Sequence, residues 1–133
     1  MTRANRCGAG YYSIVRRPKN RPAQNSLHPL ITIMIYVVAK AEIRPECLDA
    51  YLEILKEFVP QVLGEEGCIR YEPCVAWSAD GTRKPFVTMM ETWANKACLD
   101  KHLSTPQMQE FRAKIAGMRV GASDLQILEP ALH

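Results

Sequence analysis

Two side chains in the segment from Phe86 to Phe111 could carry out proton chemistry. Glu91 stands near the end of an apolar run, and His102 follows on the next predicted element. An imidazole has an ordinary pKa of about 6.5, so it can accept a proton at neutral pH. A carboxylate can orient that imidazole or a substrate hydroxyl. The pair is therefore a candidate for general acid–base catalysis, with both residues as catalytic groups.

Both residues also have purely structural interpretations. His102 follows Leu99 by three positions, so the two share one face of a helix at the edge of the core. A histidine there can simply be a hydrogen-bonded structural residue. Glu91 shares a face of its strand with Met89, where an unpaired carboxylate is costly. It could accept hydrogen bonds from the backbone or from Arg70 instead of serving a reaction.

Aromatic and methionine side chains near this pair could bind a small apolar ligand. Trp93 and Tyr71 each offer a flat apolar surface and one hydrogen-bond donor, which suits an aromatic ligand as well as a core. Met89 would line an adjoining cavity with adaptable apolar surface. Met108 and Phe111 belong to the apolar stripe of a predicted helix and would face the same space. We take these five as candidate substrate-binding residues, with core packing as the alternative.

The elements that must position these residues follow from the hydrophobic pattern. Proline at a first helical turn and Asn or Thr at a cap position mark where the helices begin, and an Asp-Gly pair marks the turn of a hairpin. The predicted elements are a strand over residues 33–43, a helix over 45–63, strands over 68–77 and 86–93, a short helix after Asn95, a helix from Pro106, and a strand over 125–128. The order β-α-β-β-α-β, with its second helix split, predicts an α+β ferredoxin-like plait with an antiparallel sheet.

The first predicted strand implies a partner subunit. Its first half is almost continuously apolar, whereas a strand with one wet face should alternate throughout. Helices of the same chain can cover one face. Since a chain of 133 residues has little left to cover the other, a partner subunit is the simplest source of that cover.

The charge is unevenly distributed along the chain. Residues 1–33 hold six basic residues and no acidic one, which leaves 11 (17 − 6) basic residues against all 14 acidic ones in residues 34–133. We therefore expect a basic, disordered N-terminal extension over residues 1–33 and one folded domain over residues 34–133. The extension is either an organelle transit peptide or a stretch upstream of a true start at Met34. Because the domain itself is acidic, we expect no nucleic-acid partner.

Several other classes of protein are disfavoured. The five cysteines are odd in number and show no CxxC spacing, which argues against a disulfide framework or structural zinc and favours a reducing, cytoplasmic location. No apolar run is long enough to cross a membrane. Glycine-rich phosphate loops, HExxH and a nucleophile elbow are missing from the sequence. We therefore expect neither a metal nor another cofactor.

From about Met34 to Pro130 the sequence resembles the antibiotic biosynthesis monooxygenase (ABM) superfamily, and within it the small bacterial quinol monooxygenases. The resemblance rests on several short motifs taken together, each of them weak alone. They are Val59-Pro60-Gln61-Val62-Leu63, Glu65-Glu66-Gly67-Cys68, Tyr71, Met90-Glu91-Thr92-Trp93, His102-Leu103, Thr105-Pro106, Met108 and Ile127-Leu128-Glu129-Pro130.

The resemblance implies a dimeric α/β barrel-type assembly in which the two sheets pack face to face, with an apolar pocket in each protomer. It implies cofactor-independent oxidation of electron-rich phenols or quinols by O₂, with Glu91, Trp93 and His102 at the pocket. Relatives that degrade haem use an asparagine on the first strand. Residues 36–38 contain none, which argues against haem cleavage.

Two alternative functions remain open at this level. One is an isomerase of a small carbonyl or phosphorylated metabolite, which would use the same His/Glu pair and need no oxygen. The other is a non-catalytic dimeric module that binds small apolar ligands. Both alternatives require the pocket. Only the isomerase also requires proton transfer by His102 and Glu91.

Overall fold

The computed structural model describes residues 33–132 of the chain. Almost all of the basic extension predicted for residues 1–33 lies outside the described residues. The described part follows the predicted order, with the second helix split in two. Its elements are β1 (Ile35–Glu42), a short 3₁₀ helix η1 (Pro45–Cys47), α1 (Leu48–Leu63), β2 (Cys68–Trp77), β3 (Arg83–Trp93), α2 (Lys96–Leu103), α3 (Pro106–Ile115) and β4 (Asp124–Leu128).

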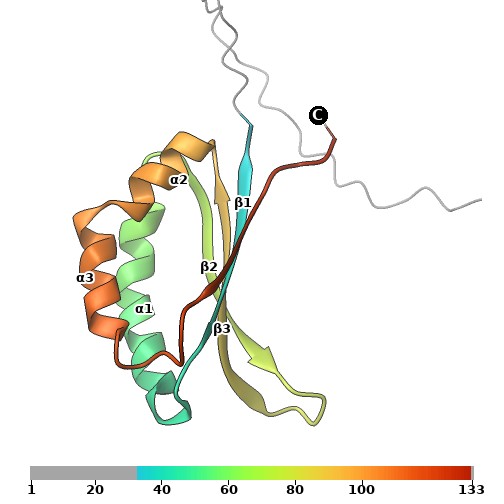
Figure 1. The fold of residues 1–133 in the computed structure, drawn as a ribbon, viewed down its shortest axis with the longest axis vertical. Coiled ribbons are helices and arrows are strands. Elements are labelled where there is room, and N and C mark those ends of the chain that lie inside the picture. The colour runs from blue at the N-terminus through green and yellow to red at the C-terminus, as the bar shows by residue number, and fades with distance from the viewer. Residues whose placement is uncertain (1–32, 133) are drawn as a thin grey trace, which may run out of the picture. The chain divides into compact units, whose positions relative to one another are not determined.

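The four strands form one antiparallel sheet in the order β2-β3-β1-β4. This is the ferredoxin-like arrangement that the sequence predicts, because each β-α-β unit leaves room for one antiparallel strand between its two strands. Helices α1, α2 and α3 all lie on the same side of the sheet (Figure 1). The core lies between these helices and the sheet face that they cover.

Strand β1 alternates more strongly than its sequence suggests. Ile35, Val37 and Ala41 are buried beneath the helices, whereas Tyr36 and Lys40 are exposed on the other face. Within the described chain, therefore, only one face of β1 is well covered. The cover expected for the second face has to come from elsewhere, so the expected partner subunit stays a prediction at this point.

Two predicted caps hold α2 and α3 in place. The side chain of Asn95 accepts a hydrogen bond from the Cys98 amide at 2.9 Å, and Thr105 accepts one from the Met108 amide at 3.2 Å. Each cap satisfies a backbone donor that the first turn of a helix leaves unpaired. His102 lies in the last turn of α2, three residues before the capping residue Thr105.

The loop between α1 and β2 passes unusually close to α2. Gly67 has a φ of 76°, a conformation in which glycine is strongly favoured. A Cβ atom at this position would lie 2.7 Å from the Cβ of Cys98 and would collide with its sulfur. The Ala94 amide donates to the Gly67 carbonyl at 2.8 Å. Glycine thus lets the loop pack directly against α2 and brings Glu65 to His102.

Candidate active site

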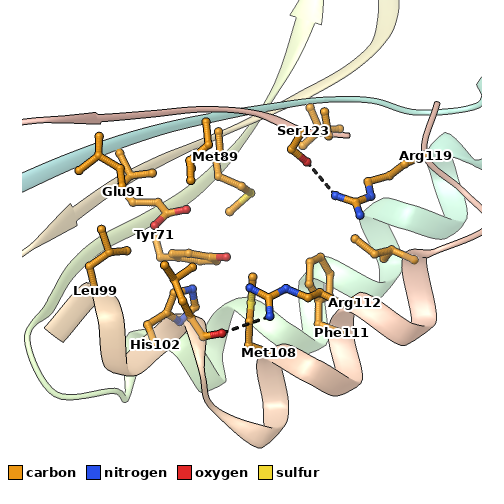
Figure 2. A pocket seen from close by; sticks show the side chains of 18 of the residues that line it. Tyr71, Met89, Glu91, Leu99, His102, Met108, Phe111, Arg112, Arg119 and Ser123 are labelled. Carbon is orange, nitrogen blue, oxygen red and sulfur yellow. Dashed lines mark hydrogen bonds between the residues drawn. The ribbon is translucent and has the colours of Figure 1, made fainter. Parts of the chain in front are cut away.

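A cavity of about 220 Å³ lies between the helices and the covered face of the sheet (Figure 2). Six of the seven side chains that the sequence proposes for a site line it. They are Tyr71, Met89, Glu91, His102, Met108 and Phe111. They come from β2, β3, α2 and α3, so the cavity exists only once these elements have packed together.

His102 is paired with Glu65. Its Nδ1 atom lies 3.0 Å and 3.2 Å from the two carboxylate oxygens of Glu65. The histidine side chain is 1% exposed and that of Glu65 is 12% exposed. This corrects the expectation that Glu91 would orient the imidazole. Glu91 lines the same cavity but is hydrogen-bonded elsewhere.

Two aromatic rings, which also contact each other, pack against the imidazole. The Trp93 ring lies 4.7 Å from the His102 ring, measured between centroids, with a tilt of 31°. The Tyr71 ring contacts it edge-on, at 5.4 Å and 66°. Tyr71 itself remains a protonated phenol at neutral pH, because burial raises its pKa far above the ordinary value. A ring fixed by a carboxylate and two aromatic contacts has little freedom to rotate, so the direction of its second nitrogen is set.

His102 is neutral in this environment. Burial lowers the pKa of His102 below its ordinary value, the Glu65 carboxylate works in the opposite direction, and the Arg112 guanidinium lowers the pKa further. Because the Nδ1 atom faces a carboxylate, it carries the hydrogen, and Nε2 keeps its lone pair. Such an imidazole can accept a proton at Nε2 while the carboxylate stabilises the resulting cation.

Replacing Glu65 with glutamine should lower the pKa of His102 further, because the carboxylate is the group that raises it. The variant should also lose the fixed tautomer, since an amide can either accept from Nδ1 or donate to it. Nitrogen-15 NMR of the imidazole across a pH titration measures both effects. Glu66→Gln is the matched control, because Glu66 pairs with Lys101 at the exposed surface. A His102 pKa that is unchanged or higher in Glu65→Gln would contradict the pairing.

Glu91 has an unusual environment for a carboxylate. Its Oε2 atom accepts a hydrogen bond from the Trp93 indole at 2.9 Å. Burial raises the pKa of Glu91 to about 7, with the Trp93 hydrogen bond opposing and the charge of Glu65 adding to the rise. Arg70, considered as a partner from the sequence, pairs with Glu72 instead. Near neutral pH, Glu91 is therefore present in both protonation states and can either accept or donate a proton.

Trp93 is the one predicted substrate-binding residue that does not line the cavity. It is fully buried and lies behind Glu91 and His102. Its indole nitrogen donates to Glu91 and its ring packs on His102. The geometry thus makes Trp93 a residue that positions these two groups, in place of the ligand-stacking surface expected from the sequence.

Sequence reasoning did not place several residues that also line or support the cavity. Glu65 had a signal, since it belongs to the Glu65-Glu66-Gly67-Cys68 motif at the end of α1. Arg112 and Arg119 both line the cavity, and no spacing in the sequence indicates this. Ser123 lines it too and accepts a hydrogen bond from Arg119. These residues meet only through tertiary packing.

Two properties of residues 33–132 complete the description of the site. In this range no three side chains of His, Cys, Asp or Glu gather as potential ligands of a metal ion. None of its helices combines the length and the apolar character needed to cross a membrane.

Known proteins are similar to this chain in sequence and in fold. Residues 34–114 match the family described as antibiotic biosynthesis monooxygenase. The chain is 32% identical over 105 residues to "Probable quinol monooxygenase YgiN" of Escherichia coli (strain K12), which covers 74% of this chain and 100% of that protein. A conserved protein from Methanosarcina mazei Go1 superposes with a TM-score of 0.64 at 26% identity, over 73% of this chain and 92% of that one. Rv0793 from Mycobacterium tuberculosis gives a TM-score of 0.64 at 23% identity, over 75% of this chain and 97% of that one. The chain therefore belongs to the antibiotic biosynthesis monooxygenase family.

Proposed function

We propose that this protein is a monooxygenase that oxidises small electron-rich aromatic diols or phenols with O₂, and that His102 is its base. The observation that carries the proposal is the neutral, buried imidazole of His102. It lines an apolar cavity, and Glu65 binds its Nδ1 atom. Family membership supports the reaction class. The relative from Escherichia coli named as a probable quinol monooxygenase supports the choice of substrate.

The size of the cavity agrees with a single substituted ring. An apolar cavity of about 150 Å³ can hold benzene, and the cavity here measures about 220 Å³. Met89, Met108 and Phe111 supply apolar surface for such a ring. Binding there would remove the ring from water, which strengthens the electrostatic interactions of the nearby polar groups.

The proposed reaction begins with proton removal from a ring hydroxyl. Nε2 of His102 takes the phenolic proton, and Glu65 stabilises the imidazolium that forms. The phenolate is richer in electrons than the phenol and can transfer an electron to O₂, after which the two radicals combine at a ring carbon. Glu91 lines the same cavity and, with a pKa of about 7, can return a proton to the reduced oxygen.

The overall reaction is balanced without a further reductant. Conversion of the diol to the dione releases two electrons, and replacement of a ring C–H by C–OH releases two more. These four electrons reduce O₂, one atom of which becomes the new ring hydroxyl while the other leaves as water. The product is a hydroxyquinone.

The test is oxygen uptake with 2-methylhydroquinone, a single-ring diol, corrected for the rate without protein and repeated under argon. We expect protein-dependent consumption of one O₂ per diol, with one atom of ¹⁸O₂ appearing in the product. Conversion at the same rate under argon would point to the isomerase alternative. Saturable binding with no protein-dependent consumption of the diol would point to the ligand-binding module.

We also propose that the sheet face away from the helices packs against a second copy of the chain. Tyr36 and Leu128 are exposed there at 38% and 46%, and they lie on neighbouring strands. Val38 and Met90 are partly buried and face each other across β1 and β3. This apolar face is where the expected homodimer would form, since it supplies the cover that β1 lacks within its own chain.

Replacing Val38 with lysine should convert the dimer to a monomer, because it would place two like charges in a desolvated interface. Sedimentation equilibrium measures the change. Gln109→Lys adds the same charge on exposed α3, on the helix side, and should leave the dimer intact. A monomeric wild type, or a Val38→Lys variant that remains dimeric, would show that this face is not the interface.

A further inference from the structure

Two arginines bring positive charge into the cavity. Arg112 projects from α3, and Arg119 lies in the segment between α3 and β4; both line the cavity. In Figure 2, Arg119 lies across the cavity from Glu91, and the guanidinium of Arg112 reaches toward the open space between them. The cavity therefore has an acid–base end and a cationic end. The proton chemistry proposed above uses only the first.

Neither arginine has a carboxylate partner among residues 33–132. Arg112 donates to the Leu103 carbonyl at 3.2 Å, and Arg119 donates through Nη1 to the Ser123 hydroxyl at 2.8 Å. Both acceptors are neutral. By contrast, Arg70 and Lys114 at the surface of this domain pair with Glu72 and Glu110. Positive charge at the wall of an apolar cavity is therefore left for another group to balance.

One edge of the Arg119 guanidinium has no hydrogen-bond acceptor. Its Nε–H is buried and has no hydrogen-bond partner within the described chain. Because Ser123 occupies Nη1, the edge formed by Nε and Nη2 is left for another acceptor. This edge can bind a planar carboxylate through two parallel hydrogen bonds. A buried donor without an acceptor is costly, so a ligand that accepts from it gains affinity.

The backbone on either side of Arg119 is fixed before any ligand arrives. Residues Ile43 and Arg119 form an isolated β-bridge. The Arg44 amide donates to the Met118 carbonyl at 2.8 Å, and the Val120 amide donates to the Glu42 carbonyl at 2.9 Å. A side chain anchored this way, and held at its tip by Ser123, loses little further freedom on binding.

We infer that the natural ligand of this cavity is an aromatic compound that carries a carboxylate, held by Arg119 and Arg112, while its ring hydroxyl lies toward His102. The inference rests on the proposed function for the identity of the ring. It adds that the substrate is an anion, which the apolar residues of the cavity wall do not by themselves imply.

The test compares two ligands that differ only in the group at C1, the carboxylate of 2,5-dihydroxybenzoate or the neutral carboxamide of 2,5-dihydroxybenzamide. Calorimetry without oxygen gives their affinities independently of any turnover. We expect the wild type to bind the benzoate more tightly by roughly tenfold to a hundredfold, as one or two charge-assisted hydrogen bonds would give. Arg119→Met should remove most of this preference, because the benzoate should lose much more affinity than the benzamide. Arg119→Lys should retain part of it, since it keeps the charge but loses the paired donors.

Matched variants separate this binding role from loss of charge or loss of fold. Lys114→Met removes a cation from α3 outside this cavity, where Lys114 pairs with Glu110, and should keep the full preference. Arg112→Gln should reduce the preference, and it provides an independent test if Arg119→Met does not fold. Equal affinities in the wild type, no binding of either ligand at millimolar concentration, or an Arg119→Met variant that prefers the benzoate as strongly as the wild type would overturn the inference.

The outcomes also distinguish this inference from the proposed function. A preference for the benzoate that depends on Arg119, without any oxygen uptake, would support the anion site and reject the oxygenase. Oxidation of neutral diols, with no preference for binding the benzoate, would support the oxygenase and reject the anion site.

Discussion

Replacing His102 with asparagine should reduce the rate of diol-dependent oxygen uptake by roughly 10²- to 10⁴-fold, the usual contribution of a general base. Asparagine is the informative substitution because its amide nitrogen can still donate to Glu65, at the place where Nδ1 now donates. The variant therefore loses the Nε2 lone pair but keeps a hydrogen-bond donor for the Glu65 carboxylate. The oxygen electrode measures the loss at saturating diol, and calorimetry without oxygen should show almost unchanged binding.

The pH dependence gives the same experiment a second readout. In the wild type, the rate should rise as pH increases through the lowered pKa of His102, since only the neutral imidazole accepts a proton. In His102→Asn, this step in the profile should disappear, and the remaining rate should follow ionisation of the diol itself. Full oxygen uptake in the variant would mean that another group removes the proton, and Glu91 would be the first alternative.

Replacing Glu91 with glutamine should stabilise the protein at alkaline pH. The carboxyl group of Glu91 has a pKa of about 7 in the folded protein against an ordinary value of 4.5, so the folded state holds a proton that the unfolded state releases. The contribution of Glu91 to stability is therefore fully present below pH 4.5 and is lost as pH rises through 7. That difference in pKa corresponds to about 3 kcal/mol. Glutamine removes the penalty of burying a charge and can still accept from Trp93 through its amide oxygen.

Chemical denaturation of wild type and variant at pH 4.5 and at pH 8 measures this effect. The unfolding free energy of Glu91→Gln relative to wild type should increase by about 3 kcal/mol between the two values. Titration of His102 contributes to both proteins and largely cancels in the difference. Glu53→Gln, at an exposed carboxylate paired with Lys56, is the control and should show little change. If the difference in unfolding free energy between variant and wild type does not depend on pH, the pKa of Glu91 is not raised in the folded protein.

The two results together decide between the structural and the catalytic interpretation of Glu91. A glutamine variant that is more stable at pH 8 yet slower in oxygen uptake would mean that the carboxylate is kept at a cost to stability, as is common in active sites. A variant that is both more stable and fully active would leave Glu91 without a role in the reaction. The residue pattern around Glu91 does not by itself favour either interpretation.

The order of elements and their caps could be predicted because they depend on neighbours in the chain. The caps at Asn95 and Thr105 use residues within three positions of the amides that they bind. The strand over 68–77 coincides with β2, while β1 and β3 differ from the predicted ranges only at their ends. The apolar first half of β1 was less informative. It predicts cover on both faces, and the folded chain supplies only one.

The candidate site could be predicted in its composition but not in its pairings. Six of the seven proposed side chains line one cavity, because Tyr71, Met89 and Glu91 share one face of adjacent strands and the helices must cover that face. The hydrogen-bond partners of these side chains could not be predicted from the face on which they lie. Trp93 reaches Glu91 from two residues along the same strand, which turns the tryptophan away from a ligand and toward a supporting role.

What the sequence alone determined is therefore the fold class, the face of the sheet that becomes the cavity wall, and the presence of His102 beside it. What only the tertiary structure decided is the chemistry of that wall. His102 pairs with Glu65 across 37 positions of the chain, and this is possible because Gly67 lets the intervening loop pack against α2. Arg112 and Arg119 converge on the same cavity from α3 and the segment after it. Local patterns encode faces and ends of elements, whereas contacts between side chains far apart in sequence depend on how those elements approach one another.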